Sequence, residues 1–405
     1  MSEAMKIAVV GLGAIGAQVL WQLSRRAGVE AHGFESGYIG HPRAGAGGEG
    51  RLFRNLELTT GGYLPIIKRS DEIWRELEGL GRQRLRRMGG VLLIGGESNV
   101  QVRHAISAAR GWDVEHEVLD TAALRRRFPQ FSVTNDDIGV WDVGGGVISP
   151  ELSIAVAVEQ AGANGALVNA STQVSGVEET ANGVRLVLAS GERREFDRVV
   201  VACGGWTTKL VPELKNWIVA RRLTSAWYAG RDDDGLRELP PFMRAAPGYC
   251  YGIPNEDQRL VKLGLGFNDH LPVGDPDRAP RALTHADAQA EVERFSWILR
   301  DLLPGLRPNP VRIETFIESY TRTMHEFMGV PEGRTNTVVL GGFSGHGFKM
   351  APALGELGAQ LVLTGETAID LGFLADAQPA FSITDVETGE TTHNAVVASH
   401  DSPIP

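Results

Sequence analysis

The sequence predicts an α/β fold in which a nucleotide-binding domain is assembled from separated parts of the chain. Near the N-terminus, KIAVVGLGAIG joins a β-branched apolar run to a glycine turn and a helix-like segment. A second buried strand, DRVVVACGGWT, ends in glycines near residue 200, and a third, TVVLGGFSGHGFK, does so near residue 345. Strands that end in glycine turns before helices are typical of parallel sheets covered by helices.

Composition limits the classes of protein that fit. A chain of 405 residues is long enough for two or three domains. The formal net charge of -10 argues against a nucleic-acid groove, and no apolar run reaches membrane-spanning length. Two cysteines, Cys203 and Cys250, supply neither a disulfide framework nor a metal set. We therefore expect a cytoplasmic protein that binds small molecules and neither membranes nor nucleic acid. We expect it to be a monomer or a small homo-oligomer.

The N-terminal glycines have the spacing of a dinucleotide site. Gly11 permits the tight turn, Gly13 lets a pyrophosphate approach, and Gly16 allows the helix to pack on the strand. The pyrophosphate would sit over the helix N-terminus, next to Ala14 and Ile15. Glu35 ends a second strand, where it can accept a hydrogen bond from a ribose hydroxyl. The alternative is an ordinary tight strand-helix turn, but strand, helix and acid together favour a dinucleotide.

Three further features favour FAD over NAD. The charge of Glu35 disfavours a 2′-phosphate, which leaves NAD or the ADP half of FAD. The loop GHPRAGAGGEGRLFR is long and rich in glycine, as expected of a loop that clasps a longer cofactor. Val174, in STQVSGVEE, can meet an adenine through its backbone, and the stretch at residues 341 to 355 returns to the cofactor before a helix that Pro352 begins.

These segments supply the remaining candidate cofactor-binding residues. They are Arg43, Gly50, Arg51, Val174, Cys203, Gly204, Trp206, Gly342, Ser344, Gly345, His346, Gly347, Phe348 and Lys349.

Several motifs together resemble one family of flavoenzymes. They are GFSGHGFK at 342 to 349, GEGRLFRN at 48 to 55, YGIP at 251 to 254, VKLG at 261 to 264 and SYTRT at 319 to 323. In this order they are similar to the FAD-dependent amine oxidases of the sarcosine oxidase and N-methyltryptophan oxidase family, within the D-amino-acid-oxidase superfamily. The resemblance runs from about Ile7 to about Phe373.

The resemblance implies an architecture. A Rossmann-like FAD-binding domain would be interleaved with an α+β catalytic domain built on an antiparallel sheet. We expect the first domain at residues 1–88, 148–214 and 325–380, the second at 89–147 and 215–324, and a tail at 381–405. The patterns of RVVVACGG, as a buried strand, and of VRLVLAS and RLVKLGLG, as half-buried strands, are compatible with this division.

The same resemblance assigns roles to charged residues. Arg51 matches an arginine that lies against the flavin; the alternative is a surface ion pair with Glu49. Arg54 and Lys349 match two cations that hold a substrate carboxylate, and a guanidinium fork with an ammonium suits that group. Each alone could be a solvated cation. As a pair they predict an amino-acid-like substrate.

Four more residues complete the implied site. Lys262 matches a lysine that activates oxygen over the flavin, although an edge-strand charge would explain it too. Tyr251 and Tyr320 match pocket tyrosines that orient the amine, or they are core tyrosines with satisfied hydroxyls. His346 either contacts flavin or substrate, or is structural.

One departure from the family concerns how the cofactor is held. Relatives bond FAD to a cysteine two residues before the tyrosine that Tyr320 matches, but Glu318 stands there in this chain. We therefore expect non-covalent FAD. The leading interpretation is an oxidase that passes hydride from an amine to flavin N5 and makes hydrogen peroxide. Alternatives are a same-fold dehydrogenase or demethylase with another acceptor, a non-catalytic flavin-binding protein, and an NAD-dependent dehydrogenase.

Overall fold

The structure is a computed structural model that describes residues 4–232, 235–279 and 283–375. The expected tail at 381–405 and the last residues of segment 325–380 lie outside these ranges. No helix within them is both long and apolar enough to cross a membrane.

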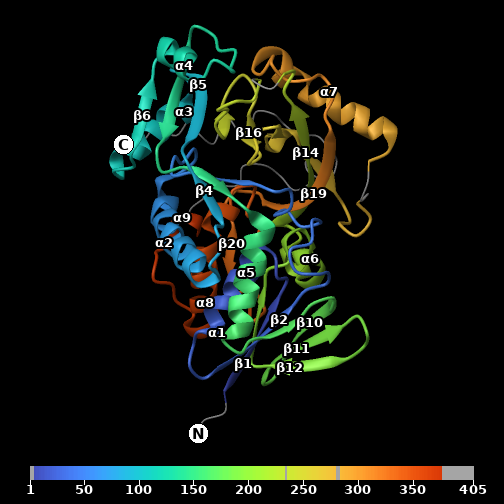
Figure 1. The fold of residues 1–405 in the computed structure, drawn as a ribbon. Helices are drawn as coiled ribbons and strands as arrows, with labels where there is room; N and C mark the ends of the chain where they lie inside the picture. The colour runs from blue at the N-terminus through green and yellow to red at the C-terminus, as the bar shows by residue number, and fades with distance from the viewer. Residues whose placement is uncertain (1–3, 233–234, 280–282, 376–405) are drawn as a thin grey trace.

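A six-stranded sheet forms the lower part of the molecule in Figure 1. Four of its strands come from the three glycine-terminated runs and the strand that precedes Glu35, and all of these pair in parallel. The order across the sheet is β20 (Phe327–Gly329), β21 (Thr337–Gly341), β13 (Arg198–Val201), β1 (Met5–Val10), β2 (Val29–Phe34) and β9 (Leu167–Asn169). The predicted nucleotide-binding sheet, built from separated segments, is confirmed.

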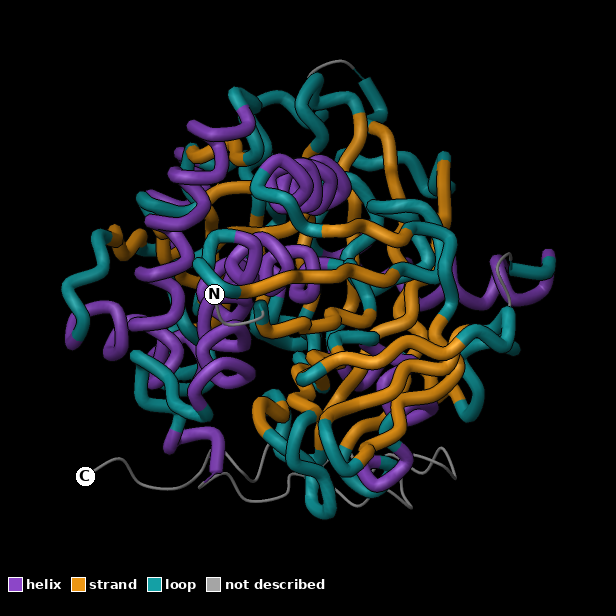
Figure 2. The backbone as a smooth tube through the Cα atoms, turned by 90° about the horizontal axis from the view of Figure 1, so that it is seen from below, coloured by secondary structure: helices purple, strands orange, loops and turns teal. Residues whose placement is uncertain are grey.

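Helices cover one face of this sheet and a small sheet covers the other. Ile7 and Val9 of β1 point into a core shared with the helices, whereas Ala8 and Val10 point into the core beneath the small sheet. In Figure 2, a group of helices and a twisted group of strands occupy different sides of the view. The covering elements are α1 (Ala14–Ser24), α2 (Leu64–Gly81), α5 (Pro150–Ala163) and α8 (Ala351–Thr364), and β10 (Val174–Thr180), β11 (Gly183–Leu188) and β12 (Arg193–Phe196).

A nine-stranded sheet forms the upper part of the molecule (Figure 1). Its pairings are antiparallel except for β15 with β5, which is parallel. The order is β18 (Leu271–Val273), β14 (Ile218–Ala229), β17 (Leu260–Leu265), β16 (Cys250–Pro254), β15 (Phe242–Arg244), β5 (Val91–Gly96), β7 (Asp137–Asp142) and β6 (His116–Leu119), with β19 (Arg312–Thr321) also paired to β14. The expected second, largely antiparallel sheet is therefore present.

One strand of this sheet differs from its sequence pattern. The alternation in RLVKLGLG predicts a half-buried β17, but every residue from Val261 to Leu265 is buried. One face packs in a core with α7 (His285–Asp301), and the other is covered where Lys262 meets a loop and Tyr251 lies on Gly264. Strand β11 does show the predicted alternation.

Short elements connect the two large sheets. A three-stranded sheet, with β8 in its centre, lies between the two large sheets and includes the strand that begins at Arg51. The strands of this sheet are β3 (Arg51–Phe53), β8 (Gly146–Ile148) and β4 (Arg86–Met88). Further helices of the described chain are α3 (Val100–Gly111), α4 (Thr121–Arg127), α6 (Thr207–Leu210) and α9 (Gly372–Ala375).

Candidate cofactor and substrate site

A cavity of about 1400 Å³ lies where the two large sheets meet. Its walls come from the N-terminal glycine turn, the loop after Glu35, the strand end near residue 203, β19 and the glycine loop near residue 345. The predicted cofactor residues that line it are Gly11, Gly13, Ala14, Ile15, Glu35, Arg43, Arg51, Val174, Cys203, Gly204, Trp206, Gly345, Gly347 and Phe348. Segments up to about 340 positions apart in sequence thus share one cavity.

The three N-terminal glycines are glycine for different reasons. A methyl group on Gly11 would lie 2.7 Å from the carbonyl oxygen of Ala202, and one on Gly16 would lie 1.8 Å from that of Gly11. A methyl group on Gly13 would meet no described atom within 4 Å. Packing therefore explains Gly11 and Gly16, whereas the close approach of a ligand would explain Gly13.

The N-terminus of α1 opens into this cavity. Its N-cap is Gly13, which offers no side chain to cap the first N–H groups, and the first turn carries no acidic residue. Uncapped N–H groups and the helix dipole favour an anionic group at this place. The geometry fits a pyrophosphate.

Glu35 is buried at the cavity wall with its carboxylate anchored. Oε2 accepts a hydrogen bond from the Leu12 N–H at 2.9 Å, and Oε1 accepts from the Gly37 N–H at 3.0 Å and lies 3.1 Å from His41 Nε2. Burial alone would raise the pKa of Glu35, but these partners outweigh it and lower the pKa. An anchored carboxylate with spare acceptor capacity on Oε2 suits a ribose hydroxyl.

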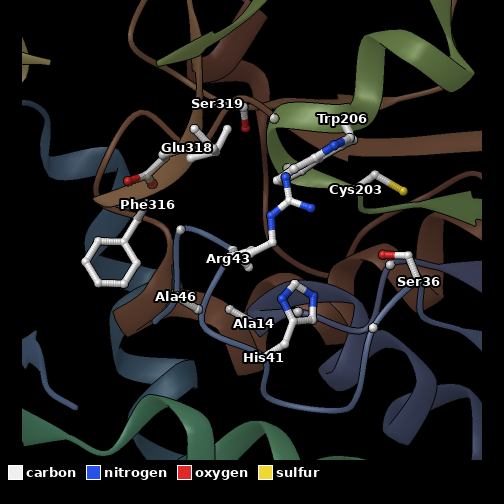
Figure 3. Close-up of a pocket in the computed structure, with 18 of the residues that line it drawn as sticks. Ala14, Ser36, His41, Arg43, Ala46, Cys203, Trp206, Phe316, Glu318 and Ser319 are labelled. Carbon is white, nitrogen blue, oxygen red and sulfur yellow. The ribbon is translucent and has the colours of Figure 1, made fainter. Parts of the chain in front are cut away.

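Arg43 and Trp206 face the cavity together in Figure 3, with Cys203 beyond them. The guanidinium of Arg43 lies 5.4 Å from the indole centroid, within cation–π range. The Cys203 thiol donates to the carbonyl of Val10 at 3.2 Å, and burial raises its pKa to about 12. A protonated, hydrogen-bonded thiol is a poor nucleophile.

Arg51 lines the cavity instead of pairing with Glu49. Its guanidinium donates to the carbonyls of Gly50, at 3.0 Å, and Gly45. Glu49 instead binds Arg312 and accepts from the indole of Trp227. The alternative of an Arg51–Glu49 surface pair is therefore wrong.

Glu318 also reaches into the cavity from β19, next to Phe316 (Figure 3). Its Oε1 accepts a hydrogen bond from the Gly345 N–H at 3.1 Å, and burial raises its pKa to about 7. The sequence alone marked Glu318 only as the residue that replaces a cysteine. Its position, at which the resemblance places the cofactor-bonded cysteine of the family, was the signal that could have placed it at the cavity.

Two further predicted cofactor residues, Gly342 and Ser344, do not line the cavity but bind the strand β19, which does. Gly342 donates its N–H to Ser319 Oγ at 3.1 Å, and Ser344 Oγ accepts from the Thr321 N–H at 3.2 Å. Both bonds tie the glycine loop to β19. The other predicted residues that do not line the cavity are Gly16, Gly50, His346, Lys349, Lys262, Arg54, Tyr251 and Tyr320.

Lys262 lies behind the loop that carries Arg51. Its Nζ donates to the carbonyls of Gly48, at 2.9 Å, and Gly50, and the side chain is buried. Burial and the nearby charge of Arg51 place the pKa of Lys262 well below its usual range. Lys262 is thus a buried residue and not an edge-strand surface charge.

Tyr320 and Tyr251 both approach this region from the nine-stranded sheet. The Tyr320 hydroxyl lies 2.5 Å from His270 Nδ1, and burial places its pKa well above the usual value. The ring of Tyr251 fills the space over Gly264, where a methyl group would come within 2.2 Å of the ring. The core reading of Tyr320, with a satisfied hydroxyl, agrees with these contacts.

A buried ionic cluster adjoins the cavity near Phe348. Glu57 lies between two predicted cations, 2.7 Å from Lys349 Nζ and 3.4 Å from the Arg54 guanidinium. His346 donates from Nε2 to the Met324 carbonyl at 3.0 Å, and burial lowers its pKa to about 4. The structure therefore brings Arg54, Lys349 and His346 together, and it adds Glu57, which was not predicted from the sequence. Its place three residues after Arg54 was the available signal.

Comparisons with known proteins identify the family of the chain. Residues 6–361 match the family described as DAO, FAD dependent oxidoreductase, and the chain belongs to this family. It is therefore an FAD-dependent oxidoreductase.

Two curated relatives span nearly the whole chain. Monomeric sarcosine oxidase from Streptomyces avermitilis is 28% identical over 384 residues, which cover 92% of this chain and 97% of the relative. N-methyl-L-tryptophan oxidase from Salmonella dublin is 28% identical, over 90% of this chain and 96% of the relative. Among solved structures, NikD, described as an unusual amino acid oxidase, superposes with a TM-score of 0.79 and 25% identity, over 94% of this chain and 99% of NikD.

Proposed function

We propose that this protein is an oxidase of an amino acid, or of a secondary or N-methyl amine, that bears a carboxylate. The observation that carries the proposal is a buried pair of cations, Arg54 and Lys349, next to a cavity suited to FAD. The names of the relatives, sarcosine oxidase and N-methyl-L-tryptophan oxidase, support the choice of an amine. The product imine would hydrolyse after release.

FAD would be held without a covalent bond. The N-terminus of α1 would face the pyrophosphate. Glu35 would accept a hydrogen bond from a ribose hydroxyl, and Val174 would contact the adenine. The cavity thiol, Cys203, has a raised pKa and donates to a carbonyl, which supports the absence of attachment there. When bound, FAD supplies an acceptor for hydride at N5 and then delivers two electrons to O₂, giving H₂O₂.

The residues of this chain would bind and orient the substrate and stabilise charge on the cofactor. Arg54 and Lys349 would hold the substrate carboxylate, and Tyr251 and Tyr320 would bound the amine. Arg51 would place a fixed positive charge against the cofactor, and Lys262 would assist oxygen from behind the Gly48–Gly50 loop. His346 would contact the cofactor or the substrate.

We further propose the division into an FAD-binding domain at 1–88, 148–214 and 325–380 and a catalytic domain at 89–147 and 215–324. The two large sheets support this division. Two free cysteines are in keeping with a reducing, cytoplasmic location, and a monomer or small homo-oligomer is the proposed state.

The test is an anaerobic titration with a panel of N-methyl amino acids, cyclic imino acids and common L- and D-amino acids. We expect at least one member to bleach the visible flavin absorbance, and air to restore it with formation of peroxide. A flavin that no member bleaches would contradict the proposal. Bleaching that air fails to reverse would indicate a dehydrogenase that uses another acceptor.

A further inference from the structure

The cations assigned to the substrate carboxylate already bind a carboxylate of this chain. Glu57 Oε2 lies 2.7 Å from Lys349 Nζ and 3.4 Å from Arg54. The exposed fractions of the three side chains are 1% for Glu57, 3% for Lys349 and 11% for Arg54. In such a buried setting an ion pair is only weakly screened by water.

The other oxygen of Glu57 is held by its own loop. Oε1 accepts from the Leu58 N–H at 2.9 Å, from the Thr59 N–H at 3.3 Å and from the Thr59 hydroxyl at 3.0 Å. These local bonds fix the carboxylate in front of Lys349. Burial alone would raise the pKa of Glu57, but Lys349 and Arg54 outweigh it and hold the pKa far below its usual value. Glu57 is therefore ionised at neutral pH.

Two acids act on the cations of this cluster, Glu57 by direct contact and the buried Asp142 through its charge. Arg54 and Lys349 carry two positive charges when protonated, and Glu57 neutralises one of them. Burial and the charge of Arg54 lower the pKa of Lys349 to about 8, against the opposing effect of Glu57. A ligand carboxylate entering the cluster would meet the two cations and also the like charge of Glu57 at the same ammonium.

We propose that Glu57 is a specificity-determining residue that competes with the substrate carboxylate for Lys349 and so weakens the binding of carboxylate ligands. The inference rests on the proposed function, in which Arg54 and Lys349 are the carboxylate site. A ligand carboxylate binds by sharing the Arg54 fork and displacing the Glu57–Lys349 contact. An uncharged ligand of the same shape has no part in this competition.

The test measures ligand binding to the FAD-loaded protein without turnover. Acetate and its uncharged isostere acetamide are titrated at neutral pH, with calorimetry and the shift of the flavin absorbance as readouts. In Glu57→Gln, which keeps the size and removes the charge, the dissociation constant of acetate should fall at least about tenfold, or about 1.4 kcal/mol. That of acetamide should not change. Glu57→Asp, whose carboxylate is drawn back by one methylene, should show a smaller change in the same direction.

Two controls separate this inference from the proposed function. Adding Arg54→Ala to Glu57→Gln should abolish the gain in acetate affinity. A folded, FAD-loaded Glu57→Gln that binds acetate as weakly as the native protein, or more weakly, would overturn the role of Glu57. Acetate binding that Arg54→Ala leaves unchanged in both backgrounds would overturn the inference and the carboxylate site together, whereas a flavin that no amine bleaches would remove only the proposed reaction.

Discussion

Lys262 donates from Nζ to the carbonyl oxygen of Gly48 at 2.9 Å, across 214 positions of sequence. The bond ties β17 of the nine-stranded sheet to the loop that carries Arg51 into the cavity. A lysine in the interior of a strand thus fixes the position of a cavity-lining arginine. The bond therefore connects the nine-stranded sheet to a loop whose next residue, Arg51, lines the cavity.

Replacing Lys262 with Met should separate the two half-reactions. Met keeps most of the buried volume and removes the donor, so reduction by substrate should change little. Reoxidation by air should slow by about a hundredfold, the loss typical when one preorganised donor or charge is removed. Stopped-flow absorbance measures both rates, and Lys68→Met, at an exposed position of α2 that does not line the cavity, is the control. Equal slowing of both steps would remove the assigned role in oxygen activation.

Replacing Gly16 or Gly13 with Ala should affect the stability of the protein very differently. In Gly16→Ala the added methyl group would lie 1.8 Å from a backbone oxygen, so the free energy of unfolding should drop by about 3 kcal/mol or more. In Gly13→Ala the methyl group meets only open space, and the cost should stay within about 1 kcal/mol, as for a changed N-cap.

FAD binding distinguishes the two variants further. Gly13→Ala should fold and yet hold FAD at least about tenfold more weakly, because the methyl group enters the space of the pyrophosphate. Denaturant unfolding of the cofactor-free protein and FAD titration measure the two effects. A Gly13→Ala protein with native FAD affinity would show that the pyrophosphate does not lie there.

Arg54→Ala should discriminate between substrates by charge. For a carboxylate-bearing amine that reduces the flavin, KM should rise by about ten- to a hundredfold, because Lys349 alone cannot supply the bidentate fork. For an uncharged amine of similar size, kcat/KM should change little. Arg54→Lys, which keeps the charge, should recover part of the loss. If both substrates suffered alike, the assigned carboxylate contact would be wrong.

Glu326 should make stability depend on pH. Its Oε2 accepts from the Tyr63 hydroxyl at 2.8 Å, Oε1 has no hydrogen-bond partner among the described residues, and burial raises its pKa to about 7. Because the folded state holds this proton more tightly than the unfolded state, its contribution to stability is complete below about pH 4.5 and is lost as pH rises through 7.

Glu326→Gln should remove that contribution. The melting temperature of the variant, relative to that of the native protein, should therefore rise between pH 5 and pH 8. His346, whose pKa is lowered to about 4, changes stability in the opposite sense between pH 4 and 6.5, so the difference between the two proteins is the informative quantity. A difference that stays constant over this range would contradict a buried, protonated Glu326.

Local patterns were enough to predict the nucleotide-binding part. The run before Gly11 and the acid after β2 are adjacent to the turns that they define, so spacing alone places them. The second sheet was harder to predict, because β14 pairs with β19 some ninety positions away and nothing local encodes that register. Burial of both faces of β17 likewise depends on a distant loop.

The ionic contacts of the site could not be read from residue type. Arg51 next to Glu49 suggests a local pair, yet Glu49 binds Arg312, which reaches it from β19. Glu57 is chemically similar to many surface acids in the chain, and only the fold places it against Lys349, 292 positions away. Pairing between distant segments decides which charges are neutralised, and hence which remain for a ligand.

The flavin content of the purified protein, before and after acid precipitation, tests the central claim most directly. We predict a yellow protein whose pigment passes entirely into the acid supernatant as FAD, in the native protein and in Cys203→Ala alike. Pigment that stays with the precipitate would show a covalent bond. A colourless protein that takes up no FAD would contradict the assignment of the cavity and every proposal built on it.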